Sequence, residues 1–344
     1  MESQHKKRSA FSGKIGFVLS AAGASVGLGN IWRFPYLAAK YGGGIFLLIY
    51  IVLALTFGYS MIVAETALGR MTGKSPVGAY ASFAKPGRRS GFLGFGGWIN
   101  AIIPVLIVPY YSVIGGWVIQ YLVGYLTGRG QELAADGYFS SFISDGAATE
   151  ICFLVFALFT LGIIFAGVRN GVERVSKVMM PVLVVLSVMI TAYSVTRPGA
   201  LAGVKYFLVP NPANFSWMTV VTAMGQMFYS LSIAMGILVT FGSYMKKDVS
   251  IEDATQNVEI FDTLIAIMAG LMIIPAVFAF SGGDPDTLQA GPALMFITIP
   301  KVFASMGLGG AVGVLFFLLV LFAAVTSSIA LTESAVSTFQ DELG

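Results

Sequence analysis

The sequence predicts an integral membrane protein built entirely from α-helices. Of its 344 residues, 56% are hydrophobic and only 11% are charged, which leaves no stretch suited to a soluble domain. About eight apolar segments are long enough to cross a bilayer, because about 20 helical residues span its hydrocarbon core. These segments lie at about 12–36, 42–69, 92–126, 148–166, 175–195, 217–243, 256–280 and 306–339. Two of them are interrupted midway, and these interruptions bear on function.

The first segment does not read as one continuous helix. Gly23 to Arg33 reads GASVGLGNIWR, and each glycine costs about 1 kcal/mol against alanine inside a helix. Lipid offers no hydrogen bonds, so backbone groups freed at this depth need a partner. Freed carbonyls suit a small cation, and amides at the start of a half-helix attract a carboxylate. Close helix packing also explains glycines at such spacing, but Asn30 and the costly Arg33 favour a functional site.

The second and third segments carry polar groups that need partners inside the membrane. Glu65 lies near the end of the second segment, among small residues that indicate contact with protein. We expect it to anchor structure, by bonding freed amides of the first helix, rather than to carry protons. Tyr110 and Tyr111 lie within the third segment, where a buried hydroxyl requires a partner. The polar loop at 127–150 is too short to be a domain, and the fourth and fifth segments carry no further signal.

The sixth segment repeats the interruption of the first, since Gly225 to Gly236 reads GQMFYSLSIAMG. Two interrupted helices, one opening each half of a chain, indicate a transporter site between inverted repeats. In the seventh segment Asp262 is expected to face the interior, because a carboxylate facing lipid costs about 2.5–3.5 kcal/mol. An outer loop at 281–305 contains apolar residues that predict a short helical cap. The consecutive hydroxyls at 326–328 in the eighth segment either bond back to their own helix or serve a site.

The charge distribution predicts the orientation in the membrane. Most of the 20 Lys and Arg residues fall on the side of the N-terminus, so the positive-inside rule places both chain ends in the cytoplasm. We expect the protein to lie in the plasma (inner) membrane. His5 and Cys152 are the only residues of their types, which excludes a His/Cys metal site and an internal disulfide. No nucleophile and base are paired, so we expect no enzymatic activity, and we expect no nucleic-acid partner.

Three motifs resemble the neurotransmitter:sodium symporter family, particularly its bacterial amino-acid transporters. They are VGLGNIWRFPY in the first segment, GQMFYSLS in the sixth and FAAVTSSIA in the eighth. The resemblance runs along the whole chain and implies an inverted-repeat fold with interrupted first and sixth helices. It also implies sodium-coupled import of an amino acid by alternating access. The expected partners are the amino acid, sodium ions and the bilayer, with the oligomeric state open between monomer and homodimer.

The resemblance implies two sodium sites built from hard oxygen ligands, as a small alkali cation requires. The first would use the Ser25 carbonyl and the side chains of Asn30, Ser230 and Asp262. The second would use the carbonyls of Gly23, Val26 and Ala323 and the hydroxyls of Thr326 and Ser327. Asp262 has two interpretations: it replaces an asparagine ligand of the first sodium or, shifted by one helical turn, it replaces the chloride that animal members require. Either one predicts independence from chloride.

The resemblance also implies how an amino acid would be bound. Its carboxylate would meet the amides of Gly27, Leu28 and Gly29, the first sodium and the hydroxyl of Tyr111. Its ammonium would meet carbonyls near Ser25, Tyr229 and Ser232 and the hydroxyl of Ser327. The side-chain pocket would be walled by Val26, Tyr229, Met235 and Leu331, and Arg33 would belong to an outer gate. Because this wall is apolar and carries no carboxylate, a neutral hydrophobic amino acid is favoured, aliphatic or aromatic.

The sequence departs from the family at its C-terminal end. Family members have eleven or twelve spanning helices, whereas this chain stops after the eighth with FQDELG. The ninth and tenth helices, and the acidic residue that would pair with Arg33, are not in this sequence. We therefore keep an alternative, in which the chain is a truncated, non-transporting remnant that at most binds substrate or partners.

Overall fold

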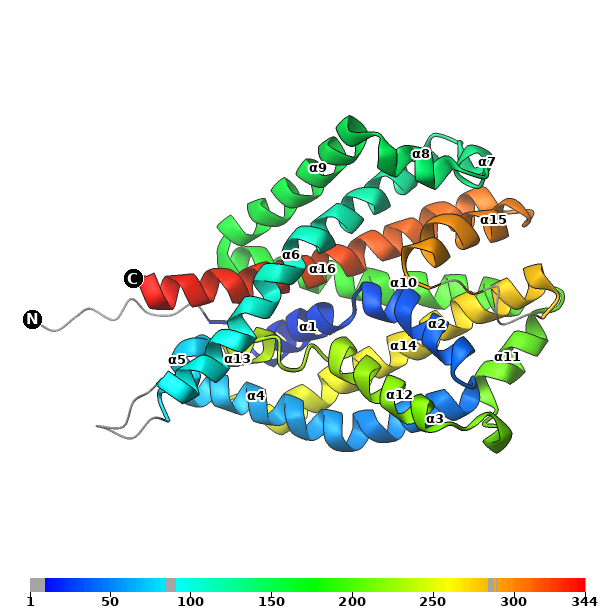
Figure 1. Ribbon diagram of the computed structural model, residues 1–344. Coiled ribbons are helices and arrows are strands. Elements are labelled where there is room, and N and C mark those ends of the chain that lie inside the picture. The colour runs from blue at the N-terminus through cyan, green and yellow to red at the C-terminus, as the bar shows by residue number, and fades with distance from the viewer. Residues whose placement is uncertain (1–9, 84–90, 284–287, 289, 344) are drawn as a thin grey trace, which may run out of the picture.

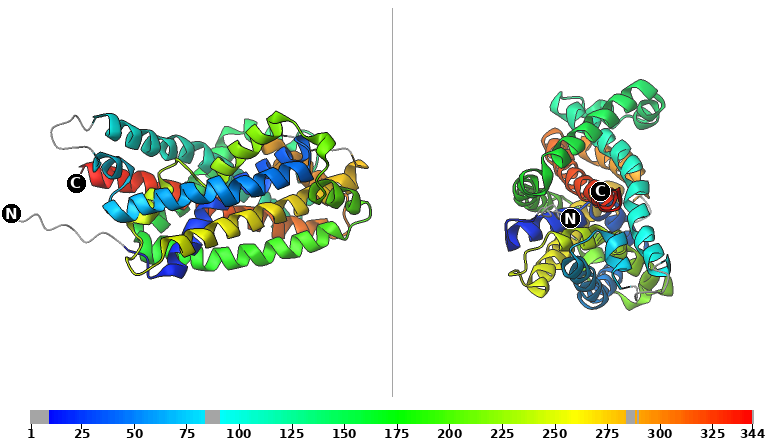
Figure 2. Two further views of the ribbon diagram at one scale, coloured as in Figure 1. Left: turned by 90° about the horizontal axis from the view of Figure 1, so that it is seen from below. Right: turned by 90° about the vertical axis from the view of Figure 1, so that its left-hand side faces the viewer.

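The structure is a bundle of helices that run roughly along one long axis (Figures 1 and 2). This computed structural model describes residues 10–83, 91–283, 288 and 290–343. Within them the only strand-like pairing is an isolated bridge between Gly43 and Pro210. The start of α1 and the end of α16 lie at the same end of the bundle (Figure 1), which we call the inner end. The opposite end, with α7, α8, α11 and α15, is the outer end.

Six helical stretches in the described part of the chain are long and apolar enough to cross a bilayer. They are Gly44–Thr72, Gly94–Leu126, Gly146–Phe165, Val168–Val195, Ile251–Ser281 and Gly309–Leu343. The first combines α3 (Gly44–Leu53), the π-helical turn η2 (Ala54–Gly58) and α4 (Tyr59–Thr72); the others are α6 (Gly91–Leu126), α9 (Gly146–Phe165), η3 (Val168–Glu173) with α10 (Arg174–Val195), α14 (Ile251–Ser281) and α16 (Gly309–Leu343). Each overlaps one predicted segment, which confirms the expected all-α membrane architecture.

The two remaining predicted segments are the interrupted ones. The first consists of α1 (Lys14–Ser25) and, bent from it by 52°, η1 (Gly29–Arg33) with α2 (Phe34–Lys40). The second consists of α12 (Trp217–Ser230) and α13 (Ile237–Ser243), joined by residues 231–236. In that loop Ser232 and Ala234 have φ values of 55° and 61°. Residues with a Cβ rarely adopt this left-handed conformation, so contacts with the rest of the protein must hold the loop.

Short helices fill the connections between the spans. They are α5 (Pro76–Ala81), α7 (Gly130–Leu133), α8 (Tyr138–Ser144), α11 (Ala200–Leu208), the turn η4 (Pro212–Asn214), η6 (Leu294–Thr298) and α15 (Ile299–Ala304). The last two lie where the sequence predicts a helical cap. Lys301 of α15 contacts Asp136, just before α8, at 2.5 Å, and this ammonium holds the pKa of Asp136 below its usual range. The outer connections are therefore tied to each other.

The first interrupted helix lies at the centre of the bundle, and α9 lies at its edge (Figure 1). The most apolar parts of α14 and α16, which pack beside α1, are 67% and 72% buried. The corresponding part of α9 is only 22% buried. A membrane helix whose apolar side chains are mostly exposed is suited to contact lipid, so α9 is peripheral while the broken helices are enclosed by protein.

Two glycines bring α4 and α13 into backbone contact. A Cβ added at Gly69 would overlap the Val239 carbonyl, and one added at Gly242 would overlap the Thr66 carbonyl. Small residues allow this close approach between membrane helices. The contact holds α13, the helix that follows the loop at 231–236, against α4 of an unbroken span.

We expect Gly69→Ala to lower the melting temperature of the purified protein, because overpacking costs about 1–3 kcal/mol. Gly225→Ala in α12 is the matched control, since its added Cβ would meet nothing within 4 Å. Alanine also favours a helix over glycine by about 1 kcal/mol. A melting temperature of Gly69→Ala equal to or above that of Gly225→Ala would contradict the described packing.

Candidate functional site

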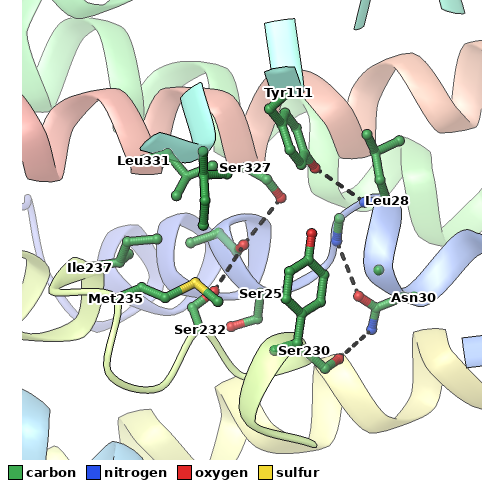
Figure 3. Close-up of a pocket in the computed structure, with 15 residues that line it drawn as sticks. Ser25, Leu28, Asn30, Tyr111, Ser230, Ser232, Met235, Ile237, Ser327 and Leu331 are labelled. Atoms are coloured by element: carbon green, nitrogen blue, oxygen red, sulfur yellow. Dashed lines mark hydrogen bonds between the residues drawn. The ribbon is translucent and has the colours of Figure 1, made fainter. Parts of the chain in front are cut away.

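A pocket lies where the two interruptions meet α6 and α16 (Figure 3). Its empty volume is about 360 Å³, counting the space that opens to solvent. The pocket is lined by Ala24, Ser25, Gly27, Leu28, Gly29, Asn30, Ile107, Tyr111, Tyr229, Ser230, Ser232, Met235, Ile237, Ser327 and Leu331. Figure 3 shows an apolar side at Met235, Ile237 and Leu331 and a polar side at Tyr111 and Asn30. The pocket therefore suits a molecule with one polar and one apolar part.

Backbone amides of the first interruption form one polar corner. The Leu28 amide donates to the Tyr111 hydroxyl at 3.1 Å, and the Gly27 amide donates to Asn30 Oδ1 at 3.2 Å. Both amides lie beside the start of η1, where the helix dipole favours negative charge. A Cβ at Gly27 would come within 2.6 Å of Ser327 Oγ and 2.9 Å of the Tyr111 oxygen. This corner offers the amide donors and the phenol that a carboxylate can bind.

Asn30, Ser230 and Asp262 form a cluster that is at most 1% exposed. Asn30 Nδ2 lies 3.0 Å from Ser230 Oγ and 2.8 Å from Asp262 Oδ1, and Ser230 Oγ lies 2.9 Å and 2.8 Å from the two carboxylate oxygens. Asp262 has no ion-pair partner in the part of the chain that the structure describes. A buried carboxylate is costly without a compensating charge. Turning the Asn30 amide over would present three hard oxygens, so these residues fit a small cation.

A second group of oxygens lies between α1 and α16. The Ser327 hydroxyl lies within hydrogen-bond distance of the carbonyls of Gly23 (3.2 Å), Ala24 (3.1 Å) and Val26 (3.4 Å). One hydroxyl near three carbonyls shows that these oxygens converge. The close approach depends on Gly23, where a Cβ would come 3.1 Å from Thr326 Cβ.

The Thr326 hydroxyl bonds back to its own helix. It lies 2.9 Å from the Phe322 carbonyl and 3.2 Å from the Ala323 carbonyl. The sequence left open whether these hydroxyls bond to their own helix or serve a site. In the structure Thr326 bonds to its own helix α16, whereas Ser327 reaches carbonyls of α1.

The outer side of the pocket is covered by a chain of polar and aromatic contacts. Arg33 Nη1 donates to Gln226 Oε1 at 3.2 Å, and Gln226 Nε2 donates to the Gly29 carbonyl at 3.1 Å. The Arg33 guanidinium lies 5.1 Å from the centre of the Tyr229 ring, whose hydroxyl is 3.5 Å from that of Tyr110. Arg33 was expected at an outer gate, whereas Gln226 was not expected at the site.

Glu65 holds the second interruption rather than the first. Its side chain is 6% exposed, and Oε1 accepts a hydrogen bond from the Ala234 amide at 2.7 Å. The anchoring role of Glu65 stays a prediction, but the amide that it contacts in the described structure belongs to the second interruption and not, as predicted, to the first helix. Glu65 lies beside the loop at 231–236 because the glycine contact packs α4 closely against α13. Ala234 is one of the two left-handed residues there.

Besides Gln226, four residues of the site were not predicted from the sequence, namely Ala24, Tyr50, Ile107 and Ile237. Tyr50 of α3 is fully buried and donates from its hydroxyl to Asp262 Oδ2 at 3.1 Å. A tyrosine in an apolar run was the available signal, because its hydroxyl requires a partner. Ile107 and Ile237 line the pocket, and nothing distinguishes them in the sequence from other apolar residues. Val26, expected in the pocket wall, is fully buried and is not among the lining residues.

Comparison with known proteins shows what this arrangement is similar to. Residues 8–134 and 138–344 match the model of the sodium:neurotransmitter symporter family. The chain is 37% identical over 331 residues to the uncharacterized sodium-dependent transporter YhdH of Bacillus subtilis, covering 95% of the chain and 72% of YhdH. It is 31% identical over 360 residues to an uncharacterized sodium-dependent transporter of Haemophilus influenzae, covering 100% of the chain and 76% of that protein.

A solved structure agrees with these sequence matches. The crystal structure of MhsT in complex with L-phenylalanine superposes with a TM-score of 0.86 at 36% sequence identity. The superposition covers 98% of this chain and 75% of MhsT. The family resemblance read from the motifs is therefore confirmed, as is the fold with two interrupted helices.

The role of Glu65 as an anchor can be tested by stability. We expect Glu65→Ala to lower the free energy of unfolding by about 1.5–3 kcal/mol, the usual contribution of a hydrogen bond to a charged group. Glu65→Gln keeps an oxygen that can accept from the Ala234 amide, so it should lose less than half as much. Chemical denaturation of the detergent-solubilised protein measures both, and equal losses in the two variants would contradict the anchoring contact.

Proposed function

Because the chain belongs to the sodium:neurotransmitter symporter family, we propose that it imports a neutral hydrophobic amino acid together with sodium by alternating access. The observation that carries the proposal is the pocket where both interrupted helices meet. It combines amide donors and an apolar wall, and the buried Asp262 carboxylate lies behind its lining residues Asn30 and Ser230. A multi-pass membrane protein with such a pocket can bind a zwitterion and a cation side by side.

The first sodium is proposed to bind at the cluster of Asn30, Ser230 and Asp262, with the Ser25 carbonyl. Support comes from the burial of Asp262 and from its lack of a basic partner among the described residues. One monovalent cation there would balance the charge of one carboxylate. Tyr50 keeps the second carboxylate oxygen in place through its 3.1 Å hydrogen bond.

The second sodium is proposed to bind between α1 and α16. The proposed ligands are the carbonyls of Gly23, Val26 and Ala323 and the hydroxyls of Thr326 and Ser327. Support comes from Ser327, whose hydroxyl reaches the carbonyls of Gly23 and Val26. Such a cation would join α1, the inner half of the first interrupted helix, to the unbroken helix α16.

The substrate is proposed to place its carboxylate at the amides of residues 27–29 and the Tyr111 hydroxyl. Its ammonium would lie near the Ser25 and Ser232 backbone and the Ser327 hydroxyl. The side chain would then extend toward Met235, Ile237 and Leu331, which form the apolar side in Figure 3. None of the lining residues is acidic or basic, which favours an uncharged side chain. MhsT, solved with L-phenylalanine, supports an aromatic member of this class.

Asn30 provides a physical reason for coupling sodium to substrate. Its amide group contacts the Gly27 amide on the substrate side and Asp262 on the cation side. A substrate that fixes the orientation of the Asn30 amide therefore also fixes which Asn30 atom faces the cation, and a bound cation fixes which atom faces the substrate. Such coupling is reciprocal, so sodium and amino acid each increase the affinity for the other.

The orientation is proposed from the charge distribution. The inner end, where α1 begins, would face the cytoplasm of a plasma (inner) membrane. Arg33, whose guanidinium lies over the Tyr229 ring, would then lie between the pocket and the external side.

Sodium coupling is tested by radiolabelled uptake of phenylalanine or leucine into proteoliposomes. We expect uptake to fall at least about tenfold when external sodium is replaced by potassium, because a coupling free energy of about 1.4 kcal/mol between sodium and substrate would lower the substrate affinity about tenfold without sodium. Asn30→Ala should lose the sodium dependence of substrate binding. Asn257→Ala is the matched control, since the Asn257 side-chain amide donates to the Asp253 carbonyl of its own helix.

Equal uptake in sodium and potassium would refute the coupling. Sodium-dependent binding without uptake would instead favour the binding-only alternative.

Chloride independence is a separate expectation. Because Asp262 supplies a fixed negative charge beside the proposed first sodium, replacing chloride by gluconate should leave the initial uptake rate unchanged. Asp262→Asn removes this charge while keeping a similar side-chain shape, so the apparent sodium affinity should fall by at least about tenfold, as expected for a lost ion pair in a buried site. A wild-type rate that drops in gluconate would contradict the assigned role of Asp262.

A further inference from the structure

A second cavity lies at the outer end of the bundle. It is formed where α7 and α8 meet η6 and α15, short helices that Figure 1 shows at this end of the molecule. Its empty volume is about 230 Å³, counting the space that opens to solvent, compared with about 360 Å³ for the central pocket. The two cavities share no lining residue. This second cavity, which we call the outer cavity, is therefore separate from the proposed substrate site.

Two aromatic rings form one wall of the outer cavity. Phe139 and Phe296 both line it, and their rings are stacked, with centroids 5.3 Å apart and planes 9° from parallel. Trp117 of α6 packs edge-on against both rings. Tyr121, also of α6, donates a hydrogen bond to the Phe296 carbonyl at 2.7 Å. A membrane-spanning helix therefore holds this wall in place, and the wall offers a ligand a preformed apolar surface.

One positive charge lies at the edge of this apolar space. Among the residues that line the outer cavity, all of which the structure describes, Lys301 alone is charged. Others, such as Ala134 and Ser140, have small uncharged side chains that leave room for a ligand. A small, mostly apolar cavity with one cation fits a ligand that has an apolar body and one negative charge. An ammonium group on the ligand is disfavoured, because it would be repelled by Lys301.

The Lys301 ammonium is paired with a carboxylate that does not line the cavity. Asp136 Oδ1 lies 2.5 Å from Lys301 Nζ, and the Asp136 side chain is 91% exposed. An exposed ion pair contributes little to stability, because water hydrates both partners when they separate. A ligand carboxylate can therefore replace that of Asp136 at small cost, while the apolar part of the ligand gains free energy by leaving water.

We propose that the outer cavity is a binding site for a small apolar monocarboxylate. The ligand carboxylate pairs with Lys301 in exchange for Asp136, and the apolar part packs against Phe139 and Phe296. The site uses none of the residues assigned to sodium or to the transported amino acid, so it does not depend on the proposed function. The exchange has a signature that a purely structural ion pair lacks: removal of the Lys301 charge weakens binding, whereas removal of the Asp136 charge strengthens it.

The test measures equilibrium binding of radiolabelled 3-phenylpropionate, which has an aromatic ring and a carboxylate but no ammonium group. The full chain is placed in nanodiscs of phosphatidylcholine, a lipid without net charge, and in potassium buffer without sodium. Unlabelled 3-phenylpropylamine is the matched competitor, because it has a similar length and the same ring but carries an ammonium group in place of the carboxylate. We expect saturable binding of 3-phenylpropionate that the amine does not displace.

Four variants locate the bound ligand. Lys301→Gln should weaken binding about tenfold, since the ligand loses a hydrogen bond to a charged group. Asp136→Asn should strengthen binding about twofold to fivefold, the factor that corresponds to one exposed ion pair. Ala134→Phe places a large ring in the cavity and should abolish saturable binding. Lys205→Gln on α11 is the matched control, because it removes an exposed positive charge at the outer end from a residue that does not line the cavity.

Unchanged affinity in Lys301→Gln, or unchanged or weaker affinity in Asp136→Asn, would overturn the proposal. Equal weakening in Lys205→Gln would also overturn it, because the effect would then be one of overall charge. Displacement by the amine would overturn it as well, since the ring alone would then be recognised.

If Lys301→Gln fails to fold, Ala134→Phe and Asp136→Asn decide by the same criteria. Binding that is lost in Asn30→Ala but kept in Ala134→Phe would place the ligand in the central pocket and overturn the outer site. The two proposals fail separately: equal uptake in sodium and potassium removes the proposed function, whereas these binding results concern only the outer cavity.

Discussion

Every backbone group inside a membrane must find a hydrogen-bond partner, and the rest of this structure depends on how two broken helices meet that requirement. The Leu28 amide is satisfied by Tyr111, the Gly27 amide by Asn30, and the Ala234 amide by Glu65. The Gly29 carbonyl is satisfied by Gln226. Tyr111, Glu65 and Gln226 each come from another helix than the group they satisfy, so these three contacts also hold the bundle together, whereas Asn30 belongs to the same interrupted helix as Gly27. The same exposed dipoles are what a zwitterion and a cation can bind.

The buried charged residues are compensated in different ways, and the differences separate their roles. Glu65 accepts from a strained loop and holds it in place. Glu173 accepts from the Ser12 amide and pairs with the partly exposed Lys177. Asp262 is surrounded only by neutral donors among the described residues, so it is the carboxylate suited to a mobile cation. Burial alone would not distinguish the three, whereas the partners do.

The sequence was a good guide where the signal is local. The apolar segments, the breaks in the first and sixth of them, and the small residues within those breaks follow from residue types read along the chain. Asp262 and Asn30 could be singled out because polar groups are costly in a membrane. Glu65 was identified as an anchor for the same reason, but its partner was placed on the wrong helix. That partner depends on Gly69 and Gly242, whose contact joins two segments far apart in sequence.

The sequence by itself determined that the chain spans a membrane and where its helices break, because hydropathy and glycine content act within a single segment. Only the tertiary structure decided which side chains meet at the breaks. Tyr50 reaches Asp262, Ile107 and Ile237 line the pocket, and Val26 is packed away from it. These outcomes depend on the rotation of each helix about its axis and on how closely neighbours approach. Such quantities arise from packing between helices, which no single stretch of sequence contains.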